Sequence, residues 1–159
     1  MLKTFDEIIE QVLEHEGGYV DDPTDSGGET KYGISKKAYP DEDIKELTIE
    51  RAKELYKRDY WNRFKIDSLP SRIRHIYFDM CVNMGGSRAT KILQESCNSK
   101  NSNKIDVDGG IGKNTIKASA NLEDFRLRAY RVMFYAKLVM KKPEQVRFWV
   151  GWFRMSCEV

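Results

Sequence analysis

The chain has no long hydrophobic run. A membrane-spanning helix needs roughly 18 consecutive apolar residues, and no segment of the 159-residue sequence approaches that length. The N-terminal stretch MLKTFDEIIEQVL carries acidic residues where a secretory signal peptide would have an unbroken apolar segment. We therefore expect no stable membrane insertion and no signal peptide. Such a protein is made in the cytoplasm and needs another export route to act outside it.

Cysteine and histidine are scarce. Cys81, Cys97 and Cys157 are odd in number and lack a CxxC spacing, which argues against a disulfide framework and a zinc ribbon. We expect buried free thiols. The two histidines and scattered cysteines offer no metal-ligand spacing, so the sequence predicts no metal and no cofactor. One histidine, His75, follows a basic stretch and is expected at the surface.

The composition is that of a folded domain with two electrically unlike halves. Hydrophobic residues make up 40% of the chain and aromatic residues 11%, which is enough for one core. Residues 1–70 hold 11 Lys and Arg against 17 Asp and Glu, whereas residues 71–159 hold 16 against 8. The acidic half suits carboxylate chemistry, and the basic half suits an anionic polymer such as cell wall or nucleic acid. Charge alone does not choose between these polymers.

A capping box predicts the start of the first helix. Thr4 and Glu7 have the spacing at which each side chain satisfies the other's free backbone donor. An apolar stripe with helical spacing follows, made of Phe5, Ile8, Ile9, Val12 and Leu13. Two glycines at residues 17 and 18 then predict its end.

The rest of the chain reads as mostly helical. Residues 19–33 are dense in Asp, Pro and Gly, which predicts turns around one short hairpin. Helical patterns follow at about 35–39, 48–62, 71–84, 86–98, 113–120, 122–141 and 143–154. The polar tract NSKNSNK at 98–104 is loop-like, and the glycine-rich run at 109–113 resembles a phosphate loop only superficially. We predict a mainly α fold with a small β element.

Glu16 is the candidate for acid chemistry. Eleven residues after Phe5, at about 100° per residue, it falls inside the apolar stripe of the first helix. Desolvation and the negative end of the helix dipole are both expected to raise the pKa of its carboxyl group, which is what a general acid requires. The alternative is that Glu16 caps a helix end or pairs with a Lys or Arg.

The string around Glu16 closely resembles the motif of glycoside hydrolase family 108. It reads Glu16-Gly17-Gly18-Tyr19, then DPTDSGGET at 22–30, then Gly33-Ile34. Members of this family are lysozyme-like muramidases, many of them phage endolysins or phage-derived bacterial proteins. The resemblance implies that Glu16 is the catalytic acid. It also implies a lysozyme-like α+β fold in which a small β-hairpin lies beside the catalytic cleft.

The resemblance continues downstream. Tyr56 and Tyr60-Trp61 resemble a helix of the family, and the segments 78–94 and 108–115 are similar to the peptidoglycan-binding module found in these proteins. Near the end, Gly151-Trp152 matches an expected Gly-Trp, but Met155 stands where an arginine is expected. The likeness thus spans nearly the whole chain and departs from the pattern only in the tail.

Two further residues have a possible catalytic role. Phage-type lysozymes carry an Asp nine residues after the catalytic Glu and a Thr soon after it, and Asp25 and Thr30 fall at comparable offsets. Asp25 would stabilise an oxocarbenium-like transition state or orient a water, with Thr30 holding that water. The alternative for Asp25 is a turn residue bonded to its own backbone amides.

Sugar-binding clefts need flat apolar faces and fixed hydrogen-bond partners. The candidates for holding a glycan are Tyr19, Tyr32, Trp61, Asp79 and Asn83. Each has a structural alternative. The aromatic rings at helical spacing are typical of a core, and Asp79 and Asn83, four residues apart on one helix, are able to bond each other.

Together these observations predict a monomeric peptidoglycan hydrolase of the endolysin or muramidase type. Residues 1–70 would form the catalytic half, and residues 71–159 a peptidoglycan-binding-like half packed with it as one compact unit. The reaction would be bacteriolytic hydrolysis of the bond between N-acetylmuramic acid and N-acetylglucosamine, after release to the wall by a holin or another route. A lytic transglycosylase and a non-catalytic wall-binding or secretion-associated protein remain alternatives. We expect no nucleic acid partner, because no known nucleic-acid-binding module appears.

Overall fold

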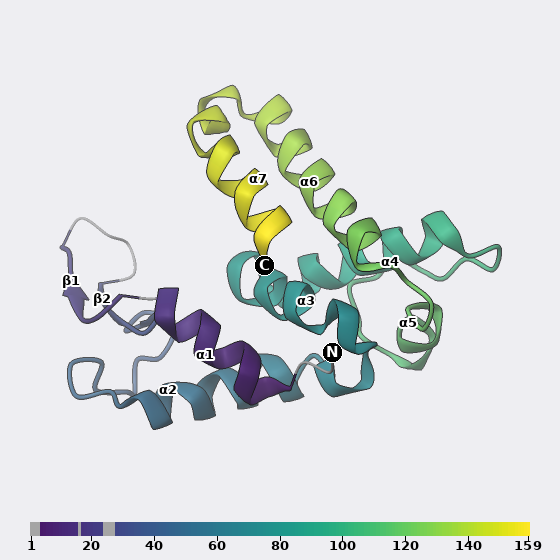
Figure 1. Cartoon of the computed structure of the whole chain (residues 1–159). Helices are drawn as coiled ribbons and strands as arrows, with labels where there is room; N and C mark the ends of the chain where they lie inside the picture. The colour runs from purple at the N-terminus through teal and green to yellow at the C-terminus, as the bar shows by residue number, and fades with distance from the viewer. Residues whose placement is uncertain (1–3, 16, 24–27) are drawn as a thin grey trace. The chain divides into compact units, whose positions relative to one another are not determined.

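The computed structural model describes residues 4–15, 17–23 and 28–159. Within these residues the chain is mainly α-helical, with seven α-helices and one small antiparallel sheet (Figure 1). The expected fold class is therefore confirmed. Contacts divide the chain into two compact units, residues 4–59 and residues 60–159, and each is described by itself below.

The elements follow one another in chain order. The first unit contains α1 (Phe5–His15), β1 (Val20–Asp21), β2 (Glu29–Lys31), β3 (Ile34–Ser35) and α2 (Ile49–Tyr56). A π-helical segment, η1 (Lys57–Asn62), continues α2. After it come η2 (Ile66–Ser68), α3 (Ser71–Met84), α4 (Gly86–Lys100), α5 (Lys113–Ala118), α6 (Asp124–Lys141), η3 (Pro143–Phe148) and α7 (Trp149–Glu158).

Helix α1 begins as its sequence predicts. The Thr4 amide donates to Glu7 Oε2 at 2.8 Å, and the Glu7 amide donates to Thr4 Oγ1 at 3.3 Å, so the capping box is formed. Of the apolar stripe, the first three members are buried, whereas Val12 and Leu13 are only half-buried. The stripe thus becomes more open towards the end of the helix, beside residue 16.

A three-stranded antiparallel sheet follows α1, in the order β1-β2-β3. Thr30 at its centre pairs with Val20 on one side and with Ser35 on the other. The expected hairpin is present and gains a third strand.

The helix expected at 35–39 is wrong. The segment leaves β3 through a turn, in which the Tyr39 amide donates to the Ser35 carbonyl at 3.0 Å and the Ala38 amide to Ser35 Oγ at 3.2 Å. Ser35 is already part of the sheet through its pairing with Thr30, and Pro40 has no amide hydrogen to extend a helix. A helical pattern of five residues is too short to compete with both constraints.

The core of the second unit lies where α3 crosses α4. The buried side chains that α3 contributes include Ile73, Ile76, Tyr77, Phe78, Met80 and Cys81. The Tyr77 hydroxyl lies 2.7 Å from Thr90 Oγ1, which in turn donates to the Gly86 carbonyl at 2.7 Å. At Gly86 the packing is so close that a Cβ atom would lie 1.8 Å from Phe64 Cζ. The start of α4 therefore has room for glycine alone while Phe64 keeps its position.

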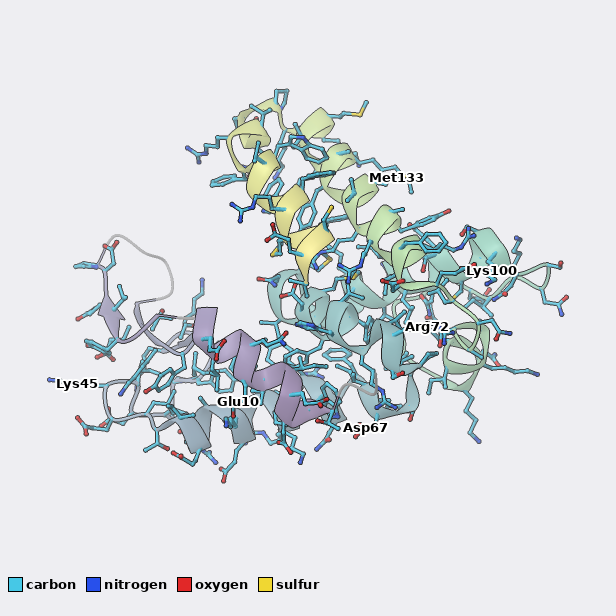
Figure 2. All side chains as sticks on the ribbon, viewed as in Figure 1. Glu10, Lys45, Asp67, Arg72, Lys100 and Met133 are labelled. Atoms are coloured by element: carbon cyan, nitrogen blue, oxygen red, sulfur yellow. The ribbon has the colours of Figure 1, made fainter. Side chains whose placement is uncertain are left out.

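Helices α6 and α7 lie against each other along their length (Figure 1). Tyr135 stacks on Trp152, with 4.8 Å between ring centroids and 16° between ring planes. Other apolar side chains of this pair are exposed, among them Met133, whose label marks the α6 surface in Figure 2. In the described part of the chain, no helix is long and apolar enough to cross a membrane.

All three cysteines are free thiols. Cys81 and Cys97 are buried as expected, but Cys157 is exposed, so the expectation was wrong for that residue. Its side chain is exposed in the last turn of α7.

Candidate active site

Two of the three predicted catalytic residues, Glu16 and Asp25, lie outside the described residues. The structure describes what stands on either side of Glu16. Helix α1 ends at His15, and Gly17 is held by a hydrogen bond that its carbonyl accepts from the Tyr32 amide at 3.4 Å. The chain next to Glu16 is thus joined to the turn between β2 and β3.

Tyr32 links that turn to helix α2. Its backbone has the left-handed conformation with φ of 52°, which is uncommon for a residue with a side chain. Its carbonyl accepts a hydrogen bond from the Tyr56 hydroxyl at 2.9 Å, and Tyr56 is 1% exposed. The buried phenol thus holds the Tyr32 backbone in this turn. The Tyr32 side chain is half-buried, and its open part is able to contact a sugar.

Thr30 lies in β2, at the centre of the sheet. Its hydroxyl makes a long contact of 3.5 Å to the Gly28 carbonyl, and its oxygen accepts no hydrogen bond from another described residue. The side chain is half-buried. The Thr30 hydroxyl thus keeps acceptor capacity, and the water site at Thr30 stays a prediction.

Tyr19 is partly exposed, at 38%, and is oriented by Glu29. Its hydroxyl donates to Glu29 Oε1 at 2.7 Å across the β1–β2 hairpin. That hydrogen bond, helped by desolvation and by the negative charge of Glu29, raises the pKa of Tyr19 to about 12. The phenol therefore stays neutral at physiological pH, with one face of its ring open to solvent.

Trp61, which belongs to the second unit, is placed differently from the other aromatic candidates. It is 1% exposed and packs edge-on against Phe78, with 5.7 Å between ring centroids and 62° between ring planes. This is the position of a core aromatic. A sugar contact through Trp61 would need its ring to become accessible.

Asp79 and Asn83 share one side of α3 but do not bond side chain to side chain. Asn83 is exposed, and its amide donates to the Asp79 backbone carbonyl at 2.9 Å. The Asp79 carboxylate instead accepts from Arg131 Nη2 of α6 at 2.5 Å. The Arg131 side chain is 0% exposed and that of Asp79 is 15% exposed, so the pair is nearly buried. Arg131 Nε and Nη1 are also buried, without a hydrogen-bond partner among the described residues.

The structure thus brings the predicted residues together in two groups. In the first unit, Tyr19 directly precedes β1, Thr30 lies in β2 and Tyr32 lies in the turn after β2. In the second unit, Trp61 lies in η1, and Asp79 and Asn83 lie in α3.

Sequence reasoning missed Glu29 and Arg131, the partners that fix Tyr19 and Asp79. For Arg131 a signal was present. It stands four residues after Leu127 and four before Tyr135, which places it in the buried stripe of α6. An arginine at such a position needs a buried acceptor, although the sequence does not say which one.

No group of three or more His, Cys, Asp or Glu side chains with the geometry of a metal site occurs among the described residues. The side chains of the described candidate residues offer carboxylate, hydroxyl, amide and aromatic groups. This is the chemistry of carbohydrate binding and acid–base catalysis.

Comparisons with protein families divide the chain into two matched regions. Residues 9–85 match the family described as glycosyl hydrolase 108, and residues 88–156 match the one described as predicted peptidoglycan domain. The first region holds Glu16 and all of the other predicted site residues. No curated protein matches the sequence.

A solved structure matches nearly the whole chain. The structure of Brucella abortus SagA has a TM-score of 0.74 and 29% sequence identity, and the match covers 96% of this chain and 91% of that one.

Proposed function

We propose that the chain, whose residues 9–85 match the glycosyl hydrolase 108 family and whose residues 88–156 match a predicted peptidoglycan domain, is a muramidase that uses Glu16 as its general acid. The two regions support a glycoside hydrolase that acts on the peptidoglycan of the cell wall. To this, the proposal adds which glycosidic bond is cleaved and that Glu16 is the acid. The bond is the one between N-acetylmuramic acid and N-acetylglucosamine, and hydrolysis uses water.

The observation that carries the assignment of Glu16 is its place in the chain. It directly follows α1, whose stripe of Phe5, Ile8 and Ile9 is buried. In the sequence, Glu16 stands at the helical spacing of that stripe, eleven residues after Phe5. A carboxyl group on such a face, at the negative end of a helix, favours its protonated form, and a protonated carboxyl is able to protonate the leaving sugar oxygen.

The neighbours of Glu16 support the proposal. Gly17 is hydrogen-bonded to Tyr32, and Thr30 lies two residues before Tyr32 in the adjacent strand. A hydroxyl with acceptor capacity and the half-buried ring of Tyr32, whose backbone is held by Tyr56, therefore lie close to Gly17, the residue that follows the acid. A protonating acid, a water site and a sugar platform are the parts that glycosidic hydrolysis needs.

We propose that Asp25 assists by stabilising the positive charge that develops on the sugar or by orienting the attacking water. A water held by Thr30 beside Asp25 before the first step suits direct attack by water, so we favour an inverting outcome with about 6.5–9.5 Å between the two carboxyl groups. Mass spectrometry of enzyme quenched during turnover would check this. A glycosyl adduct on Asp25 would show that Asp25 is a nucleophile and that the reaction is retaining.

We also propose a division of labour along the chain. Residues 1–70 would provide the cleavage chemistry, with the glycan held by Tyr19 and Tyr32, and residues 71–159 would hold the wall through their excess of positive charge. Asn83, exposed on α3, would add an amide contact to the glycan, and Asp79 would support it from the same helix. Trp61 would contribute only if its ring became accessible.

The test is Glu16→Gln. Glutamine keeps the shape of glutamate but has no proton to give at that position, so lysis of purified peptidoglycan should fall by about 10²–10⁴-fold while the protein stays folded. Glu14→Gln is the matched control, because Glu14 is exposed on the same helix. Glu10 is less suitable, since it forms an ion pair with Lys53. Lysis by Glu16→Gln at close to the wild-type rate would refute the assignment.

The same digest separates the alternatives. Hydrolysis leaves N-acetylmuramic acid at the reducing end, whereas a lytic transglycosylase leaves an anhydro product that is lighter by one water. A wall-binding protein without activity would retain peptidoglycan in a pull-down assay and release no soluble fragment.

A further inference from the structure

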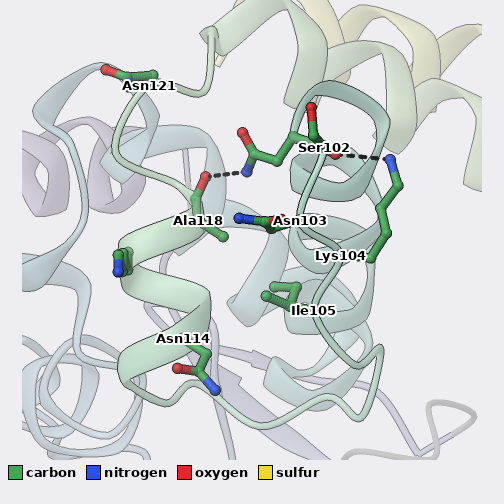
Figure 3. A pocket seen from close by; sticks show the side chains of 9 residues that line it. Ser102, Asn103, Lys104, Ile105, Asn114, Ala118 and Asn121 are labelled. Atoms are coloured by element: carbon green, nitrogen blue, oxygen red, sulfur yellow. Dashed lines mark hydrogen bonds between the residues drawn. The ribbon is translucent and has the colours of Figure 1, made fainter.

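A polar hollow of about 480 Å³ lies in the second unit, and none of the eight predicted site residues lines it. Its walls are the loop after α4 and one side of α5, and the polar tract at 98–104 forms part of its rim (Figure 3). The residues that line it are Asn101, Ser102, Asn103, Lys104, Ile105, Asn114, Lys117, Ala118 and Asn121. None of them is acidic, and four are asparagines.

The loop that forms one wall is held by hydrogen bonds. Asn98 binds the backbone of Ile105 twice, through Oδ1 to the amide at 2.9 Å and through Nδ2 to the carbonyl at 2.8 Å. Asn101 Nδ2 donates to the Ala118 carbonyl of α5 at 2.8 Å, which ties the loop to the opposite wall (Figure 3). Lys104 Nζ donates to the Asn101 carbonyl at 2.8 Å. A wall fixed in this way loses little entropy when a ligand binds.

Other polar groups of the hollow are uncommitted. The side-chain amides of Asn103 and Asn114 and the ammonium group of Lys117 make no hydrogen bond to any described residue. In Figure 3 Asn103 projects from the loop and Asn114 from α5, with Ile105 between them. Ile105 and Ala118 supply an apolar surface beside these groups.

This set of groups selects a ligand chemistry. A primary amide offers both a donor and an acceptor, which matches the C=O and N–H of a secondary amide in the ligand. The apolar surface suits the methyl group of an acetamide. The free Lys117 ammonium suits a carboxylate, through a charge-assisted hydrogen bond. A ligand that fits all three carries an acetamide group and a carboxylate.

Peptidoglycan contains this combination. We propose that the hollow binds a muropeptide segment of the wall, with the secondary amide held by Asn103 and Asn114 and the carboxylate by Lys117. The inference rests on the proposed function for its choice of polymer. It assigns a binding site to the second unit that takes part in no bond cleavage.

A second hollow extends the site. It has a volume of about 460 Å³, shares Ile105 and Asn114 with the first, and continues past Asp106 and Lys113. Two adjoining hollows of this size have room for a ligand longer than one sugar. The glycine-rich run at 109–113, which is no phosphate loop, thus forms part of the wall of the second hollow.

The test is a titration of the full chain with soluble probes, in which binding is monitored by the NMR chemical shifts of the backbone amides. Muramyl dipeptide is the main probe, since it carries both groups and has no glycosidic bond to cleave. We expect saturable shifts at residues 101–121. N-acetylmuramic acid and N-acetyl-alanyl-isoglutamine distinguish a sugar source of the carboxylate from a peptide source. Tri-N-acetylchitotriose, which lacks a carboxylate, should bind at least about tenfold more weakly than muramyl dipeptide.

Two variants test which side chains bind the probe. Lys117→Gln should weaken binding of muramyl dipeptide about tenfold, and Asn114→Ala should weaken it several-fold. Lys137→Gln is the matched control, because Lys137 is exposed on α6 outside the hollow. The affinity of this variant for muramyl dipeptide should equal that of the wild type. Circular dichroism verifies folding, and Asn103→Ala serves in place of any variant that unfolds.

Three results would overturn the inference: absence of shifts at residues 101–121, an equal loss in Lys137→Gln, or displacement of the probe by inorganic phosphate at equal concentration. Its failure is distinct from failure of the proposed function. Binding is measured without turnover, so a chain that lyses walls but leaves these residues unshifted refutes only the binding site. A chain that binds the probe yet releases no fragment from peptidoglycan refutes only the muramidase.

Discussion

The ion pair between Asp79 and Arg131 gives the sharpest test of what one predicted site residue does. Asp79 was a candidate for holding the glycan, but its carboxylate accepts a hydrogen bond from an arginine whose side chain is 0% exposed. Two further nitrogens of that arginine are buried without a partner among the described residues, so Asp79 is its neutralising contact in the described part of the chain. Asp79→Asn keeps the shape and removes the charge.

The expected loss follows from the burial. Removing one partner of a buried pair costs about 3–5 kcal/mol, because the other charge is left uncompensated in a place that water does not reach. Asp79 is 15% exposed and Asn keeps an acceptor oxygen, so we take the lower end, about 3 kcal/mol. For a chain of this length that lowers the Tm by about 6–12 °C.

The assay is thermal unfolding followed by circular dichroism, with lysis measured at a temperature where the variant is folded. Asp67→Asn is the control, since Asp67 is exposed and its Tm should change by less than about 2 °C. The double variant Asp79→Leu with Arg131→Met should recover most of the loss, because no buried charge remains. An unchanged Tm for Asp79→Asn together with lost lysis would refute the reasoning and indicate a glycan contact.

Three further expectations concern the rest of the molecule. Burial raises the pKa of the Cys81 thiol and raises that of Cys97 to about 11, so one thiol per native chain, Cys157, should react with Ellman's reagent at pH 8, and three after denaturation. A hydrogen bond from Lys100 is the main cause that lowers the pKa of Glu123 from 4.5 to about 2. Its stabilisation is therefore complete above about pH 4.5 and lost as the pH falls towards 2, and the Tm difference between wild type and Glu123→Gln should shrink over that range. Lysis of whole walls should fall as salt shortens the Debye length below about 8 Å, and cleavage of short soluble glycans should fall much less; equal salt profiles would show that the basic half of the chain is not needed for wall binding.

Local rules predicted the parts of the fold that depend on local geometry. The Thr4–Glu7 capping box and the start of the α1 stripe follow from spacings of three and four residues, and both are present. The turn at 35–39 was missed because Ser35 is committed to a strand pairing with Thr30, and that pairing is a property of the sheet.

Contacts between distant segments explain the other differences. His75 was expected at the surface because of the arginines beside it, yet it is 9% exposed. Those arginines fold away over the backbone: Arg72 donates to the Leu122 carbonyl and Arg74 to the Leu69 carbonyl, so their charges do not keep His75 in water. Long side chains cover a surface while their charged ends find partners elsewhere.

In the candidate site, too, local sequence patterns were informative and contacts between distant segments were not predicted. The motif around Glu16 predicted the family that residues 9–85 match, whereas the glycan contacts of Tyr19 and Tyr32 stay a prediction. Spacing within α3 did not reveal that the partner of Asp79 lies 52 residues further along the chain. A pattern that repeats every four residues carries no information about which other helix packs on it.

The close approach at Gly86 has a genetic consequence. Any single-base change in a glycine codon that yields another amino acid introduces a side chain with a Cβ atom. At this position the new atom would overlap the ring of Phe64, whose nearest carbon lies 1.8 Å from the place it would occupy. Every missense variant of this codon should thus force the Phe64 ring out of its place, whereas a synonymous change leaves the contact as it is.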